Sequence, residues 1–173
     1  MINGQAIKAL LEQIEPWLGL LDAQSLEQTG GDLELRQAFF GELRNATQDF
    51  AQAAQKSSLR GLCNVAMLLL RGMDARVNKP LDDDDIAQLT LWLSGVQSYL
   101  DAALDDCNCL LSDLQALSWV PKLAPAAISM LHDRLHEVTE GLRACAQERV
   151  VAEAANNVND TTPQARDDAQ DQA

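Results

Sequence analysis

The sequence predicts an all-α protein, an up-and-down bundle of about five to six helices followed by a disordered acidic C-terminal tail. Leu and Ala account for 28 and 25 of the 173 residues, whereas Val, Ile and Thr together account for 19, and this balance favours helices over strands. Apolar residues also recur every three to four positions, as on the buried face of an amphipathic helix. Since 47% of the residues are apolar, the chain can build one core.

Three helices are expected in the first half of the chain, at residues 3–21, 32–56 and about 58–73. Pro16 lies inside the first apolar pattern and predicts either a kink or the start of a new helix. Gly30 and Gly31 break the chain before the second helix, for which Asp32 is the expected N-cap. The third helix is apolar on almost every side, which is typical of the most buried helix in a bundle.

Three more helices are expected, at residues 82–103, 106–117 and about 125–149. Four consecutive aspartates at residues 82–85 begin the first of these, and they fit an N-cap and first-turn charges that complement the helix dipole. A divalent-metal loop needs spaced oxygen ligands and a glycine, and this run has neither. We expect the first four helices to form the core bundle and the last two to extend or cap it.

From residue 150 onward the apolar pattern stops. Residues 150–173 hold five acidic residues and one base among Ala, Asn, Gln and Thr, too little apolar surface to pack. We therefore expect one helical domain over residues 1–149 and a disordered acidic tail over residues 150–173.

Charge and the apolar pattern exclude several classes of function. The chain carries 26 acidic and 13 basic residues, a net charge of −13, so phosphate backbones repel it and no nucleic-acid binding is expected. The longest apolar stretch, residues 62–70, is far shorter than the roughly 20 residues of a membrane span, so no membrane insertion is expected. No signal-peptide pattern is recognisable, and Cys63 and Cys145 fit reduced core residues. The expected location is the cytoplasm.

No set of residues predicts chemistry. His132 and His136 stand four apart on one expected helix, but the glutamate of a zinc-hydrolase motif is missing between them, and we interpret them as residues at the core boundary. Cys107 and Cys109 point in different directions on a helix because one residue separates them, and no second pair completes a zinc or redox motif. We expect no catalytic residue, no metal site and no cofactor, and hence no enzyme.

Residues 33–104 contain an ordered series of helical features. A helix that bears phenylalanines is followed by the near-apolar stretch from Leu59 to Leu70, an acidic loop, and a long amphipathic helix that ends in Tyr99 and Leu100. A short helix ending near Trp119 comes next. This series resembles the histidine-containing phosphotransfer (HPt) domains of two-component signalling, and most closely the degenerate modules at the N-terminal end of the chemotaxis-type kinases that govern type IV pilus twitching.

The resemblance implies a phospho-accepting histidine on an exposed helix face, followed by lysine and glycine. The matching helix, residues 32–56, has no histidine, and on the face that it would expose it carries Thr47, Gln48 and Gln52 instead. Thr47 is the candidate substitute acceptor, but a surface threonine is usually only solvated. Histidine phosphotransfer is therefore not expected.

We expect a non-catalytic helical signalling or adaptor module that binds another protein. The predicted partner-docking face comprises Trp92, Tyr99, Gln48 and Thr47. Trp92 and Tyr99 lie seven residues apart, a spacing that fits either an exposed stripe or core packing. The alternative function is an acidic helical chaperone or anti-activator, of the secretion, flagellar or sigma-factor type, that sequesters a protein client. The apolar faces also allow pairing with a second copy of the chain as a homodimer.

Overall fold

The computed structural model describes residues 2–26, 33–76, 79, 81–103 and 107–159. Within these ranges the chain forms seven α-helices and no strand, so the predicted all-α class is confirmed. The helices are α1 (Gly4–Leu26), α2 (Leu33–Lys56), α3 (Arg60–Asp74), α4 (Asp83–Leu100), α5 (Asn108–Ala116), α6 (Pro125–His136) and α7 (Thr139–Asn159). None of the helices in these ranges contains the continuous apolar segment that a transmembrane helix requires.

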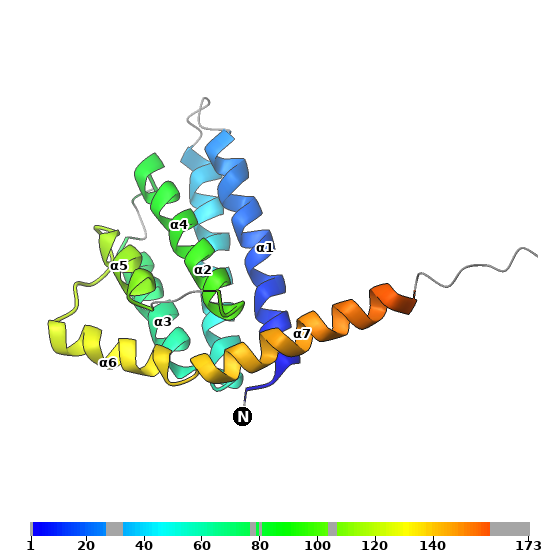
Figure 1. Ribbon diagram of the computed structural model, residues 1–173. Coiled ribbons are helices and arrows are strands. Elements are labelled where there is room, and N and C mark those ends of the chain that lie inside the picture. The colour runs from blue at the N-terminus through cyan, green and yellow to red at the C-terminus, as the bar shows by residue number, and fades with distance from the viewer. Residues whose placement is uncertain (1, 27–32, 77–78, 80, 104–106, 160–173) are drawn as a thin grey trace, which may run out of the picture.

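The first four helices form the expected up-and-down bundle. In Figure 1, α1, α2 and α4 stand side by side and α3 returns along α2. α5 packs on α4, while α6 and α7 run across the end of the bundle where the chain begins. Because α6 packs on α3 and α7 packs on α1, the last two helices cap this end.

The apolar faces of the bundle helices enclose an aromatic cluster. The Trp17 ring of α1 lies 5.9 Å from Phe50 of α2 and 6.2 Å from Trp92 of α4, measured between centroids and in edge-to-face geometry. Such pairs contribute about 0.5–1.5 kcal/mol each beyond the burial of their surface. α1 continues through Pro16 as one helix, so no new helix begins at this proline.

The helix expected at residues 125–149 is two helices, because the chain breaks between His136 and Thr139. The Thr139 hydroxyl donates to the His136 carbonyl at 2.8 Å and so satisfies a carbonyl at the end of α6. The break lets the two apolar faces meet different parts of the bundle. Leu135 of α6 and Leu142 of α7 are both buried, although α6 packs on α3 and α7 on α1.

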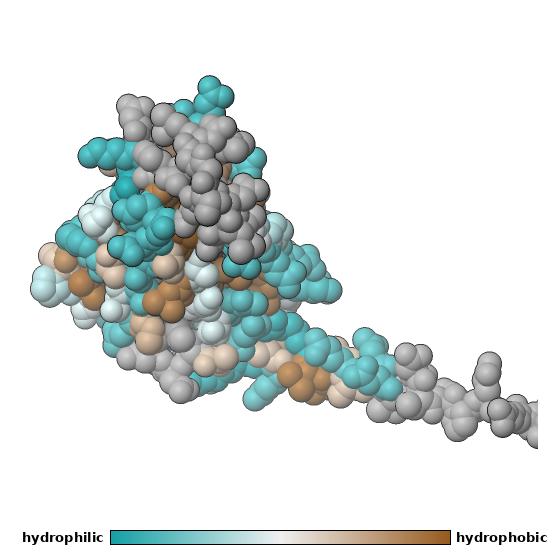
Figure 2. Space-filling model, turned by 90° about the horizontal axis from the view of Figure 1, so that it is seen from above, coloured by the Kyte–Doolittle hydropathy of each residue, from teal (hydrophilic) through white to brown (hydrophobic). Residues whose placement is uncertain are grey.

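α7 also extends further than expected. Residues 150–159, which the sequence pattern assigns to the disordered tail, are helical. They continue an existing helix, and each added residue gains a backbone hydrogen bond without a new nucleation step. Val150 and Val151 are 65% and 69% exposed, and in Figures 1 and 2 this part of α7 projects from the bundle with apolar surface along it. The rest of the expected tail, residues 160–173, lies outside the described residues.

Candidate functional site

The predicted docking face does not include its two aromatic residues, because both are buried. Trp92 and Tyr99 are 0% and 2% exposed, so core packing, the other interpretation of this pair, is confirmed. The Tyr99 hydroxyl donates to the main-chain carbonyl of Leu135 at 2.7 Å. Burial, and to a smaller extent Coulombic repulsion from Cys107, raises the pKa of Tyr99. These side chains are covered because α4 packs against α1 and α5 and because the Tyr99 hydroxyl reaches α6.

Thr47, the third residue of that face, is fully buried as well. It lies in line with Leu43 and Phe50 on the apolar face of α2, which explains its burial. Its hydroxyl donates to the Leu43 carbonyl at 2.8 Å and lies 3.7 Å from the Met73 sulfur. A hydroxyl in this position is out of reach of a phosphodonor. Of the predicted face, Gln48 alone is exposed.

The aspartates at residues 82–85 form the expected helix cap. Asp82 is the N-cap of α4, and its side chain accepts from the Asp85 amide at 2.8 Å. The Asp85 side chain accepts in turn from the Asp82 amide at 3.2 Å. Asp83 and Asp84 are exposed in the first turn, where negative charge complements the helix dipole.

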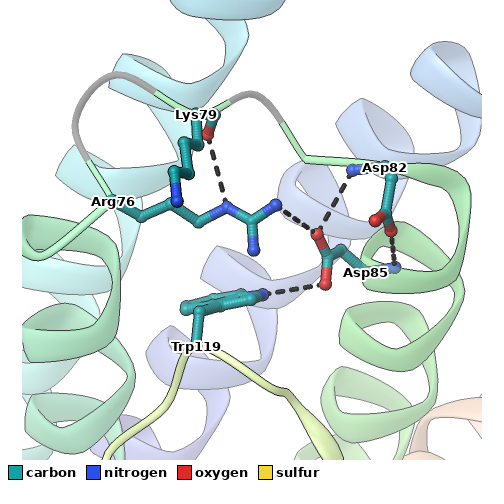
Figure 3. A network of polar contacts seen from close by, with 5 residues as sticks. All are labelled: Arg76, Lys79, Asp82, Asp85 and Trp119. Carbon is teal, nitrogen blue, oxygen red and sulfur yellow. Dashed lines mark hydrogen bonds and ion pairs between the residues drawn. The ribbon is translucent and has the colours of Figure 1, made fainter.

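Asp85 has a second role, which joins three segments of the chain. Its buried carboxylate forms an ion pair with Arg76, at 2.9 Å between Oδ2 and Nη2, and accepts at Oδ1 from the indole N–H of Trp119 at 2.9 Å (Figure 3). The Arg76 guanidinium also lies over the Trp119 ring, 5.8 Å from its centroid. Because N–H donors occupy both carboxylate oxygens, Asp85 holds α4 to the chain after α3 and to the segment between α5 and α6.

The two histidines lie together on α6. The rings of His132 and His136 stack with centroids 6.1 Å apart and an interplanar angle of 6°. His132 Nδ1 lies 3.8 Å from a carboxylate oxygen of Asp133. Across the residues that the structure describes, no group of three His, Cys, Asp or Glu side chains is placed to hold a metal ion.

The four cysteines, all within the described residues, are free. Cys107 is buried and Cys109 is exposed, so the predicted divergence of these thiols is confirmed. Cys145 is buried, as expected, and Cys63 is partly buried. Burial raises the pKa of the Cys63 thiol, which disfavours the reactive thiolate.

The clearest candidate site is a groove between α3 and α6, here called the α3–α6 groove. It encloses about 230 Å³ and is mainly apolar. Its lining residues are Asn64, Met67, Leu68 and Arg71 of α3, Leu123 ahead of α6, and Ala127, Met130, Leu131 and Arg134 of α6. Met67 and Met130 are 39% and 53% exposed. The groove therefore presents large apolar side chains to solvent, which most of the bundle does not.

The same spacing appears on both helices of the groove. In α3, Asn64, Met67 and Arg71 are three and four positions apart, and in α6 a second set repeats the spacing: Ala127, Met130 and Arg134. Residues at this spacing share one helix face. Each helix therefore contributes one methionine and one arginine to the same opening.

Two glycines fix α3 at either end of the groove. A Cβ at Gly61 would lie 2.8 Å from the Leu135 amide nitrogen, and a Cβ at Gly72 would lie 2.9 Å from the Trp119 carbonyl oxygen. Backbones approach this closely only where the side chain is absent. Gly61 stands at the start of α3 and Gly72 near its end, so α3 is held at both ends and the groove lies between these contacts.

A polar pocket of about 600 Å³ continues the groove toward the start of α3. It shares Asn64 and Arg134 with the groove, and its further lining residues are Gln55, Ser58, Arg60, Cys63 and Glu137. Arg60, Arg71 and Arg134 thus border one continuous opening, and none of them forms an ion pair with a described residue. Four other arginines do pair with carboxylates: Arg44, Arg76, Arg143 and Arg149.

Part of this site was visible in the sequence. Arg60, Asn64 and Arg71 interrupt the apolar pattern of α3 at helical spacing, which marks one solvent-facing stripe on a helix that is otherwise buried. In the sequence this stripe is only the narrow polar face of a nearly apolar helix, and no feature of the sequence indicates that α6 lies beside it.

Comparison with known proteins identifies no relative, since no family model, no curated protein and no solved structure matches this chain.

Proposed function

We propose that this chain is a non-catalytic helical module that binds another protein, with the α3–α6 groove as its docking surface. One observation carries the proposal: the groove is open and apolar, and Met67 and Met130 remain exposed in it. Grooves of this kind accept apolar side chains of partner proteins. Methionine suits such a surface because its flexible thioether adapts to the shape of the partner.

We include in this proposal a signalling role of the HPt-like type without phosphoryl transfer. The signalling role is supported by the resemblance of residues 33–104 to HPt domains and by the up-and-down arrangement of α1–α4. The lack of phosphoryl transfer is supported by the absence of histidine from the α2 sequence. The burial of Thr47 removes the substitute acceptor. The free cysteines fit a reducing compartment, and we propose the cytoplasm.

Site-specific photo-crosslinking in the cells that produce the protein tests the docking surface. A photoreactive phenylalanine analogue is incorporated at Met67, at Met130 or, as the control, at Leu91, which is 54% exposed on α4. We expect positions 67 and 130 to yield one and the same protein adduct and position 91 to yield none. Adducts of equal yield at all three positions, or none at the two groove positions, would refute the proposal.

The alternative function, sequestration of a client by an acidic chaperone, has one structural observation in its favour. α7 projects from the bundle with Val150 and Val151 exposed, close to the acidic residues that follow. If this helix bound the client, removal of residues 150–173 would abolish any protein adduct formed from position 67, even though the α3–α6 groove itself would remain intact. The docking-groove proposal predicts that the adduct at position 67 survives this truncation.

Pairing with a second copy is not part of the proposal. The helix faces that suggested a homodimer are used within the chain, because Val96, Leu100 and Leu135 are fully buried.

A further inference from the structure

We infer that the α3–α6 groove accepts an acidic amphipathic segment, whose apolar side chains enter the groove while its carboxylates meet Arg60, Arg71 and Arg134. This inference rests on the proposed docking function and specifies the chemistry of the partner.

Positive charge is concentrated at the groove, although the protein as a whole is acidic. The chain has twice as many acidic residues as basic ones, 26 against 13, yet three arginines border one opening and have no ion-pair partner among the described residues. Elsewhere, arginines are neutralised within the chain, as in the Arg44–Asp74 pair and the Arg149–Asp101 pair. Unpaired guanidinium groups recognise carboxylates well because their planar donors match the two carboxylate oxygens.

The length of the apolar floor of the groove suits a short helix. From Arg60 to Arg71, α3 rises by about 17 Å at 1.5 Å per residue, roughly three turns. A partner helix of that length presents anchors at positions i, i+4 and i+7 on one face. Met67, Met130 and Leu131 supply apolar contacts between the arginines.

Other possible occupants of the groove fit it less well. Residues 160–173 of this chain carry aspartates but no Leu, Ile, Met, Val or aromatic residue, so they would match the arginines and leave the apolar floor uncovered. A basic segment would be repelled by the three arginines at close range. An acidic segment with apolar anchors places carboxylates against the arginines and also covers the apolar floor of the groove.

Two synthetic probe peptides test the inference with the full chain. Both carry leucines at i, i+4 and i+7 and have blocked termini, and their remaining positions alternate Ala with Glu in one peptide and Ala with Lys in the other. Affinity is measured by fluorescence anisotropy at low and high ionic strength. We expect the Glu peptide to bind at least about tenfold more tightly than the Lys peptide, and we expect salt to reduce this preference because it screens exposed charges.

A matched pair of variants locates the binding. The groove variant combines Arg60→Gln, Arg71→Gln and Arg134→Gln, and the control combines Lys8→Gln, Lys56→Gln and Arg143→Gln, three exposed bases outside the groove. Both variants change the net charge equally. Each exposed pair is worth about two- to fivefold in affinity, so we expect the groove variant to lose about tenfold or more for the Glu peptide and the control to lose less than about twofold. Circular dichroism confirms that both fold.

The outcomes that contradict the inference are distinct from those that contradict the proposed function. Equal affinity for the two peptides, or equal losses in the two variants, overturns the acidic assignment while the crosslinks at Met67 and Met130 stand. Tighter binding of the Glu peptide after removal of residues 160–173 would identify the chain's own acidic residues as the occupant and overturn the partner assignment. No binding to either peptide, together with no crosslink, refutes both.

Discussion

The hydroxyl of Tyr99 on α4 donates to the main-chain carbonyl of Leu135 in the last turn of α6, at 2.7 Å. The last carbonyls of a helix have no partner within the helix, and here a side chain from the bundle supplies one. Leu135 is also the residue against which Gly61 of α3 packs. One point of α6 is therefore fixed by α4 and α3 together, next to the wall of the α3–α6 groove.

Replacing Tyr99 tests how much the hydrogen bond to the Leu135 carbonyl contributes to the stability of the fold. Tyr99→Phe keeps the ring and removes the donor, which leaves a buried carbonyl unsatisfied, so the free energy of unfolding should fall by about 1–3 kcal/mol. Urea denaturation followed by circular dichroism measures the change. A variant as stable as the parent would show that water or another donor replaces the hydroxyl.

The same residue predicts a loss of stability at alkaline pH. Burial raises the pKa of Tyr99 above its ordinary value of about 10, so the unfolded chain releases the phenolic proton at lower pH than the folded chain does. Above pH of about 10 the unfolded state binds fewer protons than the folded state, and the free energy of unfolding falls as the pH rises. Tyr99→Phe should lack this part of the pH dependence.

Tyrosinate absorbance provides a direct measurement, because the chain contains one tyrosine. The phenol should ionise together with unfolding, as seen by circular dichroism at the same pH. Ionisation near the ordinary pKa in a folded chain would show that the Tyr99 side chain is accessible.

The carboxylate of Asp85 should be essential for stability, unlike that of its neighbour Asp84. Asp85→Ala removes the ion pair to Arg76, the acceptor for Trp119 and half of the capping box, and we expect a loss of about 2–4 kcal/mol. Asp84→Ala removes an exposed charge in the same turn and should cost at most about 1 kcal/mol. Thermal unfolding of the two variants in parallel distinguishes them, and equal losses would assign the effect to the helix dipole alone.

The close approach at Gly61 gives a prediction with an internal control. In Gly61→Ala the new Cβ meets backbone atoms of Arg134 and Leu135 at 2.9 and 2.8 Å, so α6 must shift, and we expect a loss of about 1–3 kcal/mol. In Gly41→Ala, on α2, the Cβ meets no described atom within 4 Å, and the higher helix propensity of alanine should stabilise by about 0.5–1 kcal/mol.

Amide hydrogen exchange adds a local measurement to this pair of variants. Gly61→Ala should speed exchange in α6 more than in α2, whereas Gly41→Ala should leave α6 unchanged. If both variants altered stability in the same direction, the α3–α6 contact would not depend on the missing side chain.

Features that depend on a few neighbouring residues were predictable from the sequence. The helices α2 to α5 begin and end close to their expected bounds, and Asp82 caps α4 as expected. Cys107 and Cys109 point apart as the helical rotation requires. Each of these outcomes follows from periodicity or from hydrogen bonds within a single turn.

The exposure of particular residues was not predictable in the same way. From the sequence alone, Thr47 lies on the expected exposed face of its helix, and the spacing of Trp92 and Tyr99 fits either a docking stripe or core packing. All three are buried, because a helix flanked on several sides has no single solvent face. The break at residues 137–138 and the helical course of residues 150–159 were also missed. The break occurs because α6 packs on α3 whereas α7 packs on α1. Residues 150–159 are helical because they extend a helix that already exists.

The sequence by itself therefore determined the all-α class, the helices α2 to α5, the cap at Asp82 and the acidic charge of the chain, since each of these properties belongs to a residue and its near neighbours. Only the tertiary structure determined where the folded chain forms a groove that is open to solvent. It placed the stripe of Met67 and Arg71 beside that of Met130 and Arg134, which lie some sixty residues apart in the sequence. Such a groove exists only once the contacts at Gly61 and Gly72 have brought α3 against distant parts of the chain.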